Sequence, residues 1–309
     1  MALPAGTLTP TTTVSNLVQT AYDQYVRMAL RSIPVMRAIA DVKPVQQAMP
    51  GSSVVFSIYS DLSTATSTLT ETSDVSSTAL GNPSQVTVTL NEYGSAVTTT
   101  KKLNLTSFND VDAALADIIA YNAADSVDSV VASVLTGGTN VIFAGTATNR
   151  NGITAAMTIS VADIREAVTQ LRSNKALPRI GELYAAYLHP RQSADLRAES
   201  GTGGFQELTK YVERTPFVAG AVGVIEGAFV VETPRVPSVV NTGTITVYQG
   251  VVAGREALAE AMGQDITTVI GPEIDTLRRF RTIGWYYFGG FARLREAALY
   301  RIESATSIN

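Results

Sequence analysis

Cysteine is absent from this chain of 309 residues, and histidine occurs only once, at His189. The absence of cysteine excludes disulfide scaffolds, thiolate metal sites and cysteine nucleophiles. A single histidine excludes metal sites built from several histidines, and any serine–histidine chemistry would depend on His189. Charged residues make up only 16 % of the chain and the formal net charge is −4, which argues against a basic nucleic-acid-binding surface over the whole fold. Together these absences weigh against an enzyme.

Targeting and membrane-spanning patterns are also missing. The first ten residues have neither a basic start nor a long apolar run, so no signal peptide is predicted. No stretch approaches the ~20 consecutive apolar residues of a membrane-spanning helix. Because 45 % of the residues are hydrophobic, the chain can bury a core, and its length suits one large domain or two interleaved ones. We expect a soluble protein without a membrane partner.

Motifs for catalysis or phosphate binding are absent as well. Asp195 follows His189 by six residues, but the sequence has no G-x-S-x-G nucleophile turn, so a structural, hydrogen-bonded histidine is expected. Glycine-rich segments at 201–204 and 289–290 complete neither a P-loop nor a dinucleotide-binding fingerprint. We therefore expect no catalytic residue, no metal and no cofactor.

Two strand patterns flank a long polar segment. Apolar and polar residues alternate over Val54–Tyr59 and again over 86–90, which predicts two strands. Between them, residues 60–85 are dominated by serine and threonine, and such a polar excursion cannot bury enough surface to be stable alone. A long hairpin-like loop that rests on something else is favoured over a Ser/Thr-rich linker. The sizeable apolar side chains of this segment are Leu62, Leu69, Val75 and Leu80.

The strongest helix pattern runs from Asn109 to Leu135. Asn109 can cap its start, and the glycine pair at 137–138 can end it. Apolar residues at spacings of three and four trace one face of this helix. Its acidic residues are expected on a solvated face, because their spacing brings at most two of them together. These residues are Asp117, Asp125 and Asp128.

The rest of the chain mixes helices and strands without a regular βαβ repeat, which favours an α+β fold. Residues 1–14 are predicted to be an extended arm, and 15–33 a helix that packs in the core or on a neighbouring subunit. Glycine and proline at 200–216 indicate a mobile loop with one helical turn. The other expected elements are a helix capped by Ser160, a strand at Leu183–Leu188, a short helix from His189, strands at Val222–Val231 and Ile245–Tyr248, a short helix at Gly254–Met262, and β-rich runs at Ile283–Phe288 and Arg293–Ile302.

Arginine and aromatic residues concentrate in the last thirty-odd residues. Six arginines lie between Arg278 and Arg301, interspersed with aromatic residues such as those at 285–288. Arginine suits bidentate ion pairs, and arginine with aromatics is typical of interface anchors, although an aromatic cluster is more often core. Two adjacent lysines, Lys101 and Lys102, follow the polar segment. They can contact a carboxylate of a partner chain or remain solvated.

Six segments in this order resemble the major capsid proteins of tailed bacteriophages, and more narrowly the family named after the capsid protein of phage N-four. The resemblance covers nearly the whole chain. The segments are LSTATSTLTE (62–71), VTLNEYGSAVTTTKKL (88–103), YLHPRQSADLR (187–197), IEGAFVVETPRVP (225–237), VYQGVVAGREALAEA (247–261) and IGWYYFGGFARLREAALYRIE (283–303).

This resemblance implies the HK-ninety-seven-type shell fold, an α+β fold with an N-terminal arm, a long two-stranded E-loop, a peripheral domain with a spine helix, and an axial domain. The implied division is arm and first helix at 1–50, E-loop at 51–105, peripheral domain with spine helix at 106–159, axial domain at 160–265, and strands returning to the peripheral domain at 266–309. The residues expected to contact other subunits are Leu62, Leu69, Glu71, Lys101, Lys102, Arg278, Arg279 and Arg281.

The resemblance also implies a function. The chain is expected to form hexamers and pentamers of an icosahedral phage head that encloses double-stranded DNA, touching the DNA only diffusely. Some relatives crosslink a loop lysine to a neighbour, but residues 60–85 contain no lysine, so no crosslink is expected. Only about fifty residues precede the loop, which favours a separate scaffolding protein, together with portal and possibly decoration proteins.

Alternative functions remain at this point. An encapsulin-like bacterial nanocompartment uses the same fold, a hydrolase would need His189 to be essential, and a Ser/Thr-rich adhesin lacks the expected export signal. For the favoured function, the expected location is the virion capsid, assembled in the host cytoplasm.

Overall fold

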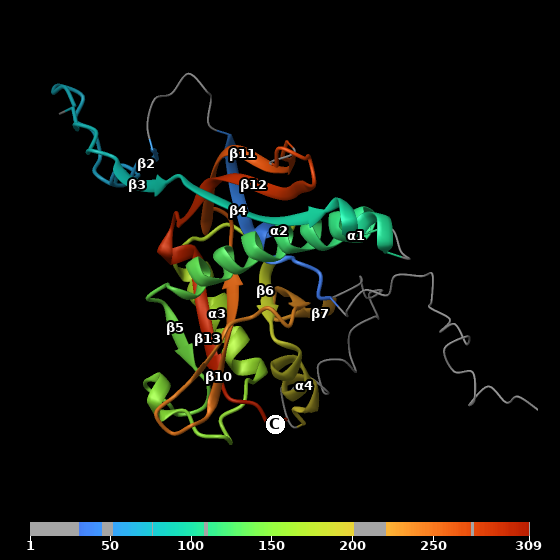
Figure 1. Cartoon of the computed structure of the whole chain (residues 1–309). Coiled ribbons are helices and arrows are strands. Elements are labelled where there is room, and N and C mark those ends of the chain that lie inside the picture. Colours follow the sequence, from blue (N-terminus) through green and yellow to red (C-terminus); the bar gives the residue numbers. More distant parts are fainter. Residues whose placement is uncertain are drawn as a thin grey trace, which may run out of the picture.

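The computed structural model of the chain describes residues 31–44, 52–75, 77–107, 111–200, 221–272 and 275–308. The arm predicted at 1–14 and nearly all of both the helix predicted at 15–33 and the loop predicted at 200–216 lie outside these residues. In Figure 1, one β-sheet lies above and one below the long helix α2 (Val111–Thr136), and a two-stranded loop projects to the upper left.

The first sheet has four strands in the order β1 (Ala40–Pro44), β11 (Leu258–Ile270), β12 (Phe280–Arg293) and β4 (Asn91–Thr100). β1 runs parallel to β11, and the other two pairs are antiparallel. Because side chains alternate along a strand, every second residue of β12 points to the same face, where helix α2 packs. Ile283, Trp285 and Tyr287 from β12 form a cluster there with Leu115, Ile119, Ala123 and Val127 from α2.

The second sheet has seven strands, in the order β5 (Val141–Phe143), β13 (Leu299–Ser304), β10 (Thr246–Ala253), β6 (Tyr184–Leu188), β8 (Ala228–Glu232) and β7 (Ala221–Ile225), with β9 (Ser238–Val240) also paired to β10. All five residues of β6 are buried, as expected for a strand with both faces covered. This sheet is mixed, since β6 pairs parallel with β8 and antiparallel with β10.

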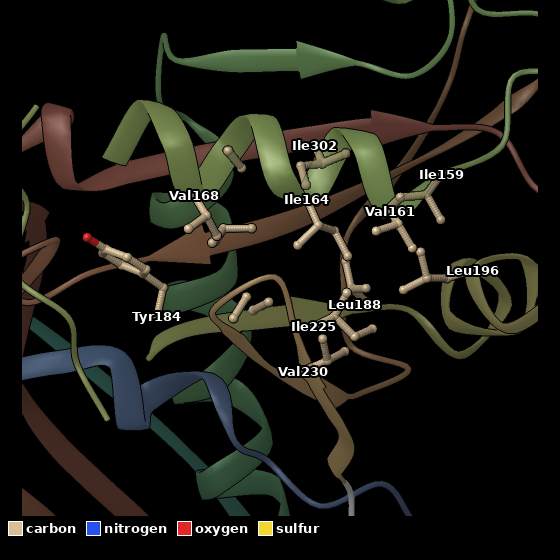
Figure 2. Close-up of a cluster of buried hydrophobic side chains, with 14 of the residues drawn as sticks. Ile159, Val161, Ile164, Val168, Tyr184, Leu188, Leu196, Ile225, Val230 and Ile302 are labelled. Carbon is tan, nitrogen blue, oxygen red and sulfur yellow. The ribbon is translucent and has the colours of Figure 1, made fainter. Parts of the chain in front are cut away.

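Helices α3 (Val161–Ser173) and α4 (Pro190–Ala198) complete the core of the second sheet. Ser160 and Asp163 form a reciprocal capping box at the start of α3, as the sequence predicts. Figure 2 shows Ile164 and Val168 of α3 directed toward the sheet. The cluster also includes Leu171, Tyr184, Leu188, Leu196, Ile225, Val230 and Ile302.

The projecting loop starts from two paired strands, β2 (Ser53–Ile58) and β3 (Ser84–Thr89), which confirm the two strands predicted around the polar segment. After β3, strand β4 carries the chain across the first sheet to a short helix, α1 (Lys101–Thr106). The two-stranded unit packs on the first sheet through a small cluster, in which Val88 and Leu90 contact Ala261 of β11. No strand or helix occupies 59–83 within the described residues.

The predicted helix at Gly254–Met262 is wrong, because residues 258–262 begin strand β11. Alanine, leucine and glutamate here are good helix formers, but β1 and β12 pair with both edges of this segment. Residues 258–261 are consequently buried, including the carboxylate of Glu260. Tertiary pairing therefore outweighs local propensity in this segment.

Two further predictions need correction. The strand predicted at Val222–Val231 is two strands, β7 and β8, joined by a turn in which Glu226 and Gly227 have φ values of 50° and 86°. The run predicted at Arg293–Ile302 is interrupted by a 3-10 turn at Glu296–Ala298 before β13 begins.

One acidic residue of α2, Asp128, differs from the expected solvated face, whereas Asp117 is exposed and Asp125 is partly exposed. Asp128 is only 1 % exposed, and its Oδ1 accepts the backbone N–H of Arg37 at 3.0 Å. Asp117 pairs with Arg31 at 2.9 Å, and Asp125 pairs with Arg235. Hydrogen bonds and ion pairs of these aspartates therefore connect helix α2 to the segment 31–37 and to Arg235, which follows β8.

Helix α2 is more apolar than the sequence-based expectation allowed. Residues Ala114–Thr136 are long and apolar enough to cross a membrane by length and composition alone. The core helix of a soluble protein has the same property, and here the apolar side chains of α2 pack on the first sheet.

Candidate subunit-contact surfaces

The projecting tip of the predicted E-loop, residues 60–83, exposes apolar side chains, and the name E-loop is used for this tip from here on. Leu62 is 59 % exposed and Leu69 is 76 % exposed, and Val75 and Leu80 are exposed to a similar degree. Hydrogen bonds along the described part of this loop are local, such as the bond from Ser73 N–H to Thr70 O at 3.4 Å. The loop therefore offers an apolar surface that the described body of its own chain does not cover (Figure 1).

The E-loop is also acidic. Its charged residues are Asp61, Glu71 and Asp74, and it contains no lysine or arginine. Asp74 accepts only the adjacent N–H of Val75, at 2.8 Å, among the described residues. Of the residues predicted to contact other subunits, Leu62, Leu69 and Glu71 thus lie together on a projecting segment that is apolar and negatively charged.

The other five predicted contact residues come together at the far end of the first sheet. The backbone N–H of Lys101 donates to the carbonyl of Arg279 at 2.7 Å, which joins the start of α1 to the β11–β12 connection. Strand β12 begins at the same place, with Arg281 paired to Thr99 of β4. We call this surface the basic corner; its exposed cations are Lys101, Lys102, Arg278, Arg279 and Arg281.

The basic corner is partly ordered by its own contacts. Arg279 Nε donates to Asp275 Oδ2 at 2.5 Å, and its guanidinium lies over the ring of Phe280 at 5.3 Å. The hydrogen bond from Arg279 lowers the pKa of Asp275. Exposed leucines, namely Leu103, Leu105 and Leu277, accompany the cations.

An open hollow lies over the first sheet on the face opposite to helix α2. Trp285 faces α2, where its indole Nε1 donates to Asn122 Oδ1 at 2.9 Å, so its neighbours Gly284 and Tyr286 face the other side. The hollow has a volume of about 370 Å³ and is lined largely by small residues, including Gly94 and Ala96. Glycine is required because a Cβ on Gly94 would lie 2.7 Å from the carbonyl oxygen of Trp285.

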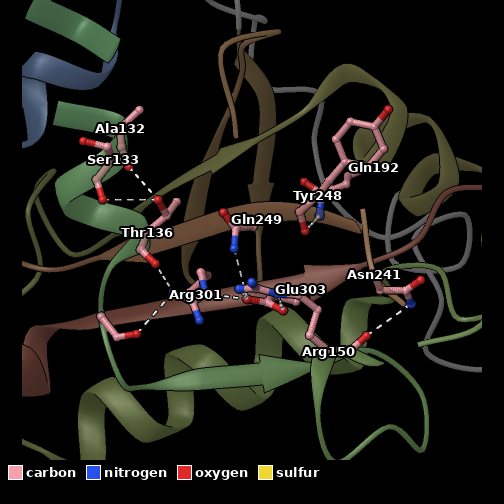
Figure 3. Close-up of polar contacts among 11 residues, drawn as sticks. Ala132, Ser133, Thr136, Arg150, Gln192, Asn241, Tyr248, Gln249, Arg301 and Glu303 are labelled. Carbon is pink, nitrogen blue, oxygen red and sulfur yellow. Dashed lines mark hydrogen bonds and ion pairs between the residues drawn. The ribbon is translucent and has the colours of Figure 1, made fainter. Parts of the chain in front are cut away.

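The other arginines near the C-terminal end stabilise the subunit itself. Arg293 donates to the carbonyl of Val134 at 2.9 Å, and Arg301 donates to the carbonyls of Thr136 and Gly138. Both therefore satisfy carbonyls at the end of helix α2, whose last turn has no basic residue of its own. Figure 3 shows Arg301 between the end of α2 and Glu303. Arg293 and Arg301 therefore make contacts within the subunit, and the interface interpretation stays a prediction for Arg278, Arg279 and Arg281.

His189 has a structural role. Its Nδ1 accepts the backbone N–H of Arg191 at 3.2 Å at the start of α4, and its ring lies 4.4 Å from that of Tyr248. Burial, with the nearby charge of Arg191, lowers the pKa of His189. Asp195 does not face it but accepts hydrogen bonds from Ser307. The two residues thus do not form a catalytic pair, and the described residues contain no cluster of three potential metal ligands.

Sequence reasoning missed an ionic cluster that connects the segment before β1 to the first sheet. Arg37 donates from Nε and Nη2 to Glu260, which is fully buried, and from Nη2 to Asp265 at 3.1 Å. Tyr287 donates its hydroxyl to the same Glu260 carboxylate at 2.9 Å. The only sequence signal was an acid within an otherwise apolar run.

A spine helix across a four-stranded sheet, a mixed second sheet and a projecting two-stranded loop define a shell subunit of the HK-ninety-seven type. The chain belongs to the phage capsid protein family, whose profile matches residues 5–308. Its function is therefore that of a phage capsid protein in a multi-subunit shell. No curated protein matches the sequence.

Solved phage capsids share this fold at low sequence identity. The capsid of cyanophage P-SCSP1u is 17 % identical with a TM-score of 0.72, over 99 % of this chain and 97 % of that one. The capsid of Ralstonia phage GP4 is 15 % identical with a TM-score of 0.73, over 94 % and 96 % of the two chains. The capsid of Helicobacter pylori bacteriophage KHP30 is 15 % identical with a TM-score of 0.72, over 94 % and 97 %. These likenesses do not favour the nanocompartment alternative.

Proposed function

We propose that many copies of this chain assemble as hexamers and pentamers into an icosahedral phage head around double-stranded DNA. One observation carries the proposal: the E-loop exposes Leu62, Leu69, Val75 and Leu80 on a segment that the described part of its own chain does not cover. Exposed apolar side chains on a projecting segment indicate a surface that becomes buried on association. The family and the shared fold of the phage capsids support this interpretation.

Assembly of this kind depends on many modest contacts. Fully burying one leucine contributes roughly 1.5–3 kcal/mol, and ordering the loop opposes part of that gain. A single loop contact is therefore weak, but a subunit that touches several neighbours at once binds far more strongly than any one contact allows. The chain acts in this proposal as a structural protein and not as an enzyme.

The test removes the loop and then only its apolar side chains. Deletion of residues 63–82 is expected to leave a soluble, folded subunit that no longer forms shells in negative-stain micrographs. Replacing Leu62, Leu69, Val75 and Leu80 with serine is expected to give the same result. A matched control replaces Thr64, Thr66, Thr68 and Thr78 with serine and is expected to assemble normally. Normal shells from the deletion would refute the assembly role of the loop.

Partners and location follow from the same proposal. We expect separate scaffolding and portal proteins, and decoration proteins where the head carries them, with diffuse contact to packaged DNA. Assembly is expected in the host cytoplasm, and the finished protein is expected in the virion capsid. Because the E-loop contains no lysine, mature heads are expected to dissociate to single chains in denaturing gels. Covalent ladders would contradict this part of the proposal.

A further inference from the structure

The E-loop and the basic corner carry opposite charges at opposite ends of one sheet. Strand β4 begins at the E-loop end, directly after β3, and finishes at Thr100, where the basic corner begins. Its ten residues span about 33 Å at ~3.3 Å per residue. Figure 1 shows the loop directed away from α1, so the two surfaces of one molecule face away from each other.

The two surfaces match in chemistry. The E-loop has Asp61, Glu71 and Asp74 and no cation, whereas the described part of the basic corner has five cations and one acid, Asp275. Each surface also exposes leucines among its charges: Leu62 and Leu69 on the loop, and Leu103, Leu105 and Leu277 on the corner.

We infer that the basic corner of one copy receives the E-loop of the next copy, with carboxylates of the loop facing the lysines and arginines and leucines packing between them. This inference rests on the proposed function and names the partner surface for its loop. A contact between two different surfaces at opposite ends of one molecule is head-to-tail, and it closes a ring when the rotation between copies permits. A ring of subunits is the unit that the proposed shell requires.

Packaged DNA is the competing occupant of a basic surface. Its phosphates would use the cations of the corner but would leave Leu103, Leu105 and Leu277 exposed to water. The acidic and apolar E-loop complements both features at once. The observations therefore favour a second copy of this chain.

Charge reversal with rescue tests the inference in the full-length chain. The corner variant is Lys101→Glu, Lys102→Glu and Arg278→Glu, and the loop variant is Asp61→Lys, Glu71→Lys and Asp74→Lys. Each alone is expected to raise the critical concentration for assembly by at least about tenfold, because like charges then face each other across the contact. The two sets combined in one chain are expected to restore assembly to within about threefold of the natural protein.

Control variants distinguish a charge contact between copies from misfolding and from DNA binding. The variant Lys101→Arg, Lys102→Arg and Arg278→Lys keeps every charge and is expected to assemble normally. Circular dichroism of each soluble variant checks that it folds. Combined reversal that assembles no better than either single set would overturn the inference, even if the loop deletion abolishes shells as proposed. Normal shells from the corner variant that retain less DNA would assign the corner to DNA and would also overturn it.

Discussion

Arg150 and Glu303 form a two-point ion pair, with Nε to Oε2 at 2.8 Å and Nη2 to Oε1 at 2.5 Å, although Glu303 is fully buried. Gln249 donates to the same carboxylate at 3.2 Å, and Arg301 Nε lies 2.8 Å from it (Figure 3). Because Arg301 also binds carbonyls at the end of α2, Glu303 connects the second sheet to the spine helix.

Replacing this carboxylate is expected to destabilise the subunit. Glu303→Gln leaves two guanidinium groups beside a neutral amide, and removing one partner of a buried ion pair costs about 3–5 kcal/mol. Urea unfolding of the unassembled subunit measures the effect. The matched control is Glu232→Gln, which removes an exposed pair with Arg197 and is expected to leave the midpoint unchanged within error. Equal midpoints for the natural chain and Glu303→Gln would contradict the assignment.

The same pair is expected to make stability depend on acid pH. Burial opposes the charged form of Glu303, but hydrogen bonds from Arg150 and the charge of Arg301 outweigh burial and hold its pKa below the ordinary value. A lowered pKa in the folded state stabilises the fold above the ordinary glutamate pKa of about 4.3, and this stability is lost as the pH falls through the folded-state value. The difference between the natural chain and Glu303→Gln is therefore expected to shrink below about pH 4. A difference that stays constant from pH 7 to pH 3 would show that the carboxylate charge is not its source.

Asp128 is expected to act in the opposite direction. Burial raises its pKa despite the backbone N–H of Arg37, so the charged form is disfavoured in the folded state. Stability is then lost as the pH rises through the folded-state pKa. The charged and titratable groups around it are Arg37, Asp125, Tyr187 and Arg235.

The variant Asp128→Asn tests this direction, because an amide oxygen can still accept the Arg37 N–H. We expect it to melt roughly 1–3 °C higher than the natural chain at pH 7 and to match it near pH 4. A lower melting temperature at pH 7 would mean that attraction to Arg235, 3.9 Å away, outweighs the cost of burial.

The glycines that line the open hollow on the first sheet, such as Gly284, are expected to be essential for strand pairing. A Cβ on Gly284 would lie 2.7 Å from the carbonyl oxygen of Ser95, too close without a backbone shift. Gly284→Ala is therefore expected to cost about 1–3 kcal/mol of unfolding free energy. Gly81→Ala is the control, since nothing lies within 4 Å of its Cβ position. Similar unfolding midpoints for the two variants would refute the close-packing argument.

Local patterns predicted the elements that depend on local interactions. Alternation identified β2 and β3, spacing identified α2, and the Ser160 cap identified α3. Strand β4 was not predicted, because its Ser/Thr-rich sequence has little alternation and it is held by pairing with β12. The burial of Asp128 was missed for a related reason: its partner, Arg37, is 91 residues away in sequence.

The contact residues show the same limit. Lys101 and Arg279 were each identified from composition, but only the backbone bond between them shows that they share one surface. Lys101 and Arg279 lie at the end of the first sheet opposite to the E-loop because of the direction in which β4 runs. No local pattern encodes that direction.

Tyr287 and Tyr286 are adjacent on β12 but face opposite sides of the sheet, which allows a matched comparison. Burial raises the pKa of Tyr287, so its hydroxyl stays protonated and donates to Glu260. Tyr287→Phe leaves that buried carboxylate with Arg37 alone among its side-chain donors in the described residues, and is expected to cost about 1–2 kcal/mol of unfolding free energy. Tyr286→Phe removes a hydroxyl that makes no hydrogen bond to the described part of the chain, and its unfolding midpoint is expected to match that of the natural protein. Chemical unfolding of the unassembled subunits compares the two, and an equal loss in both variants would remove the role assigned to the Tyr287 hydroxyl.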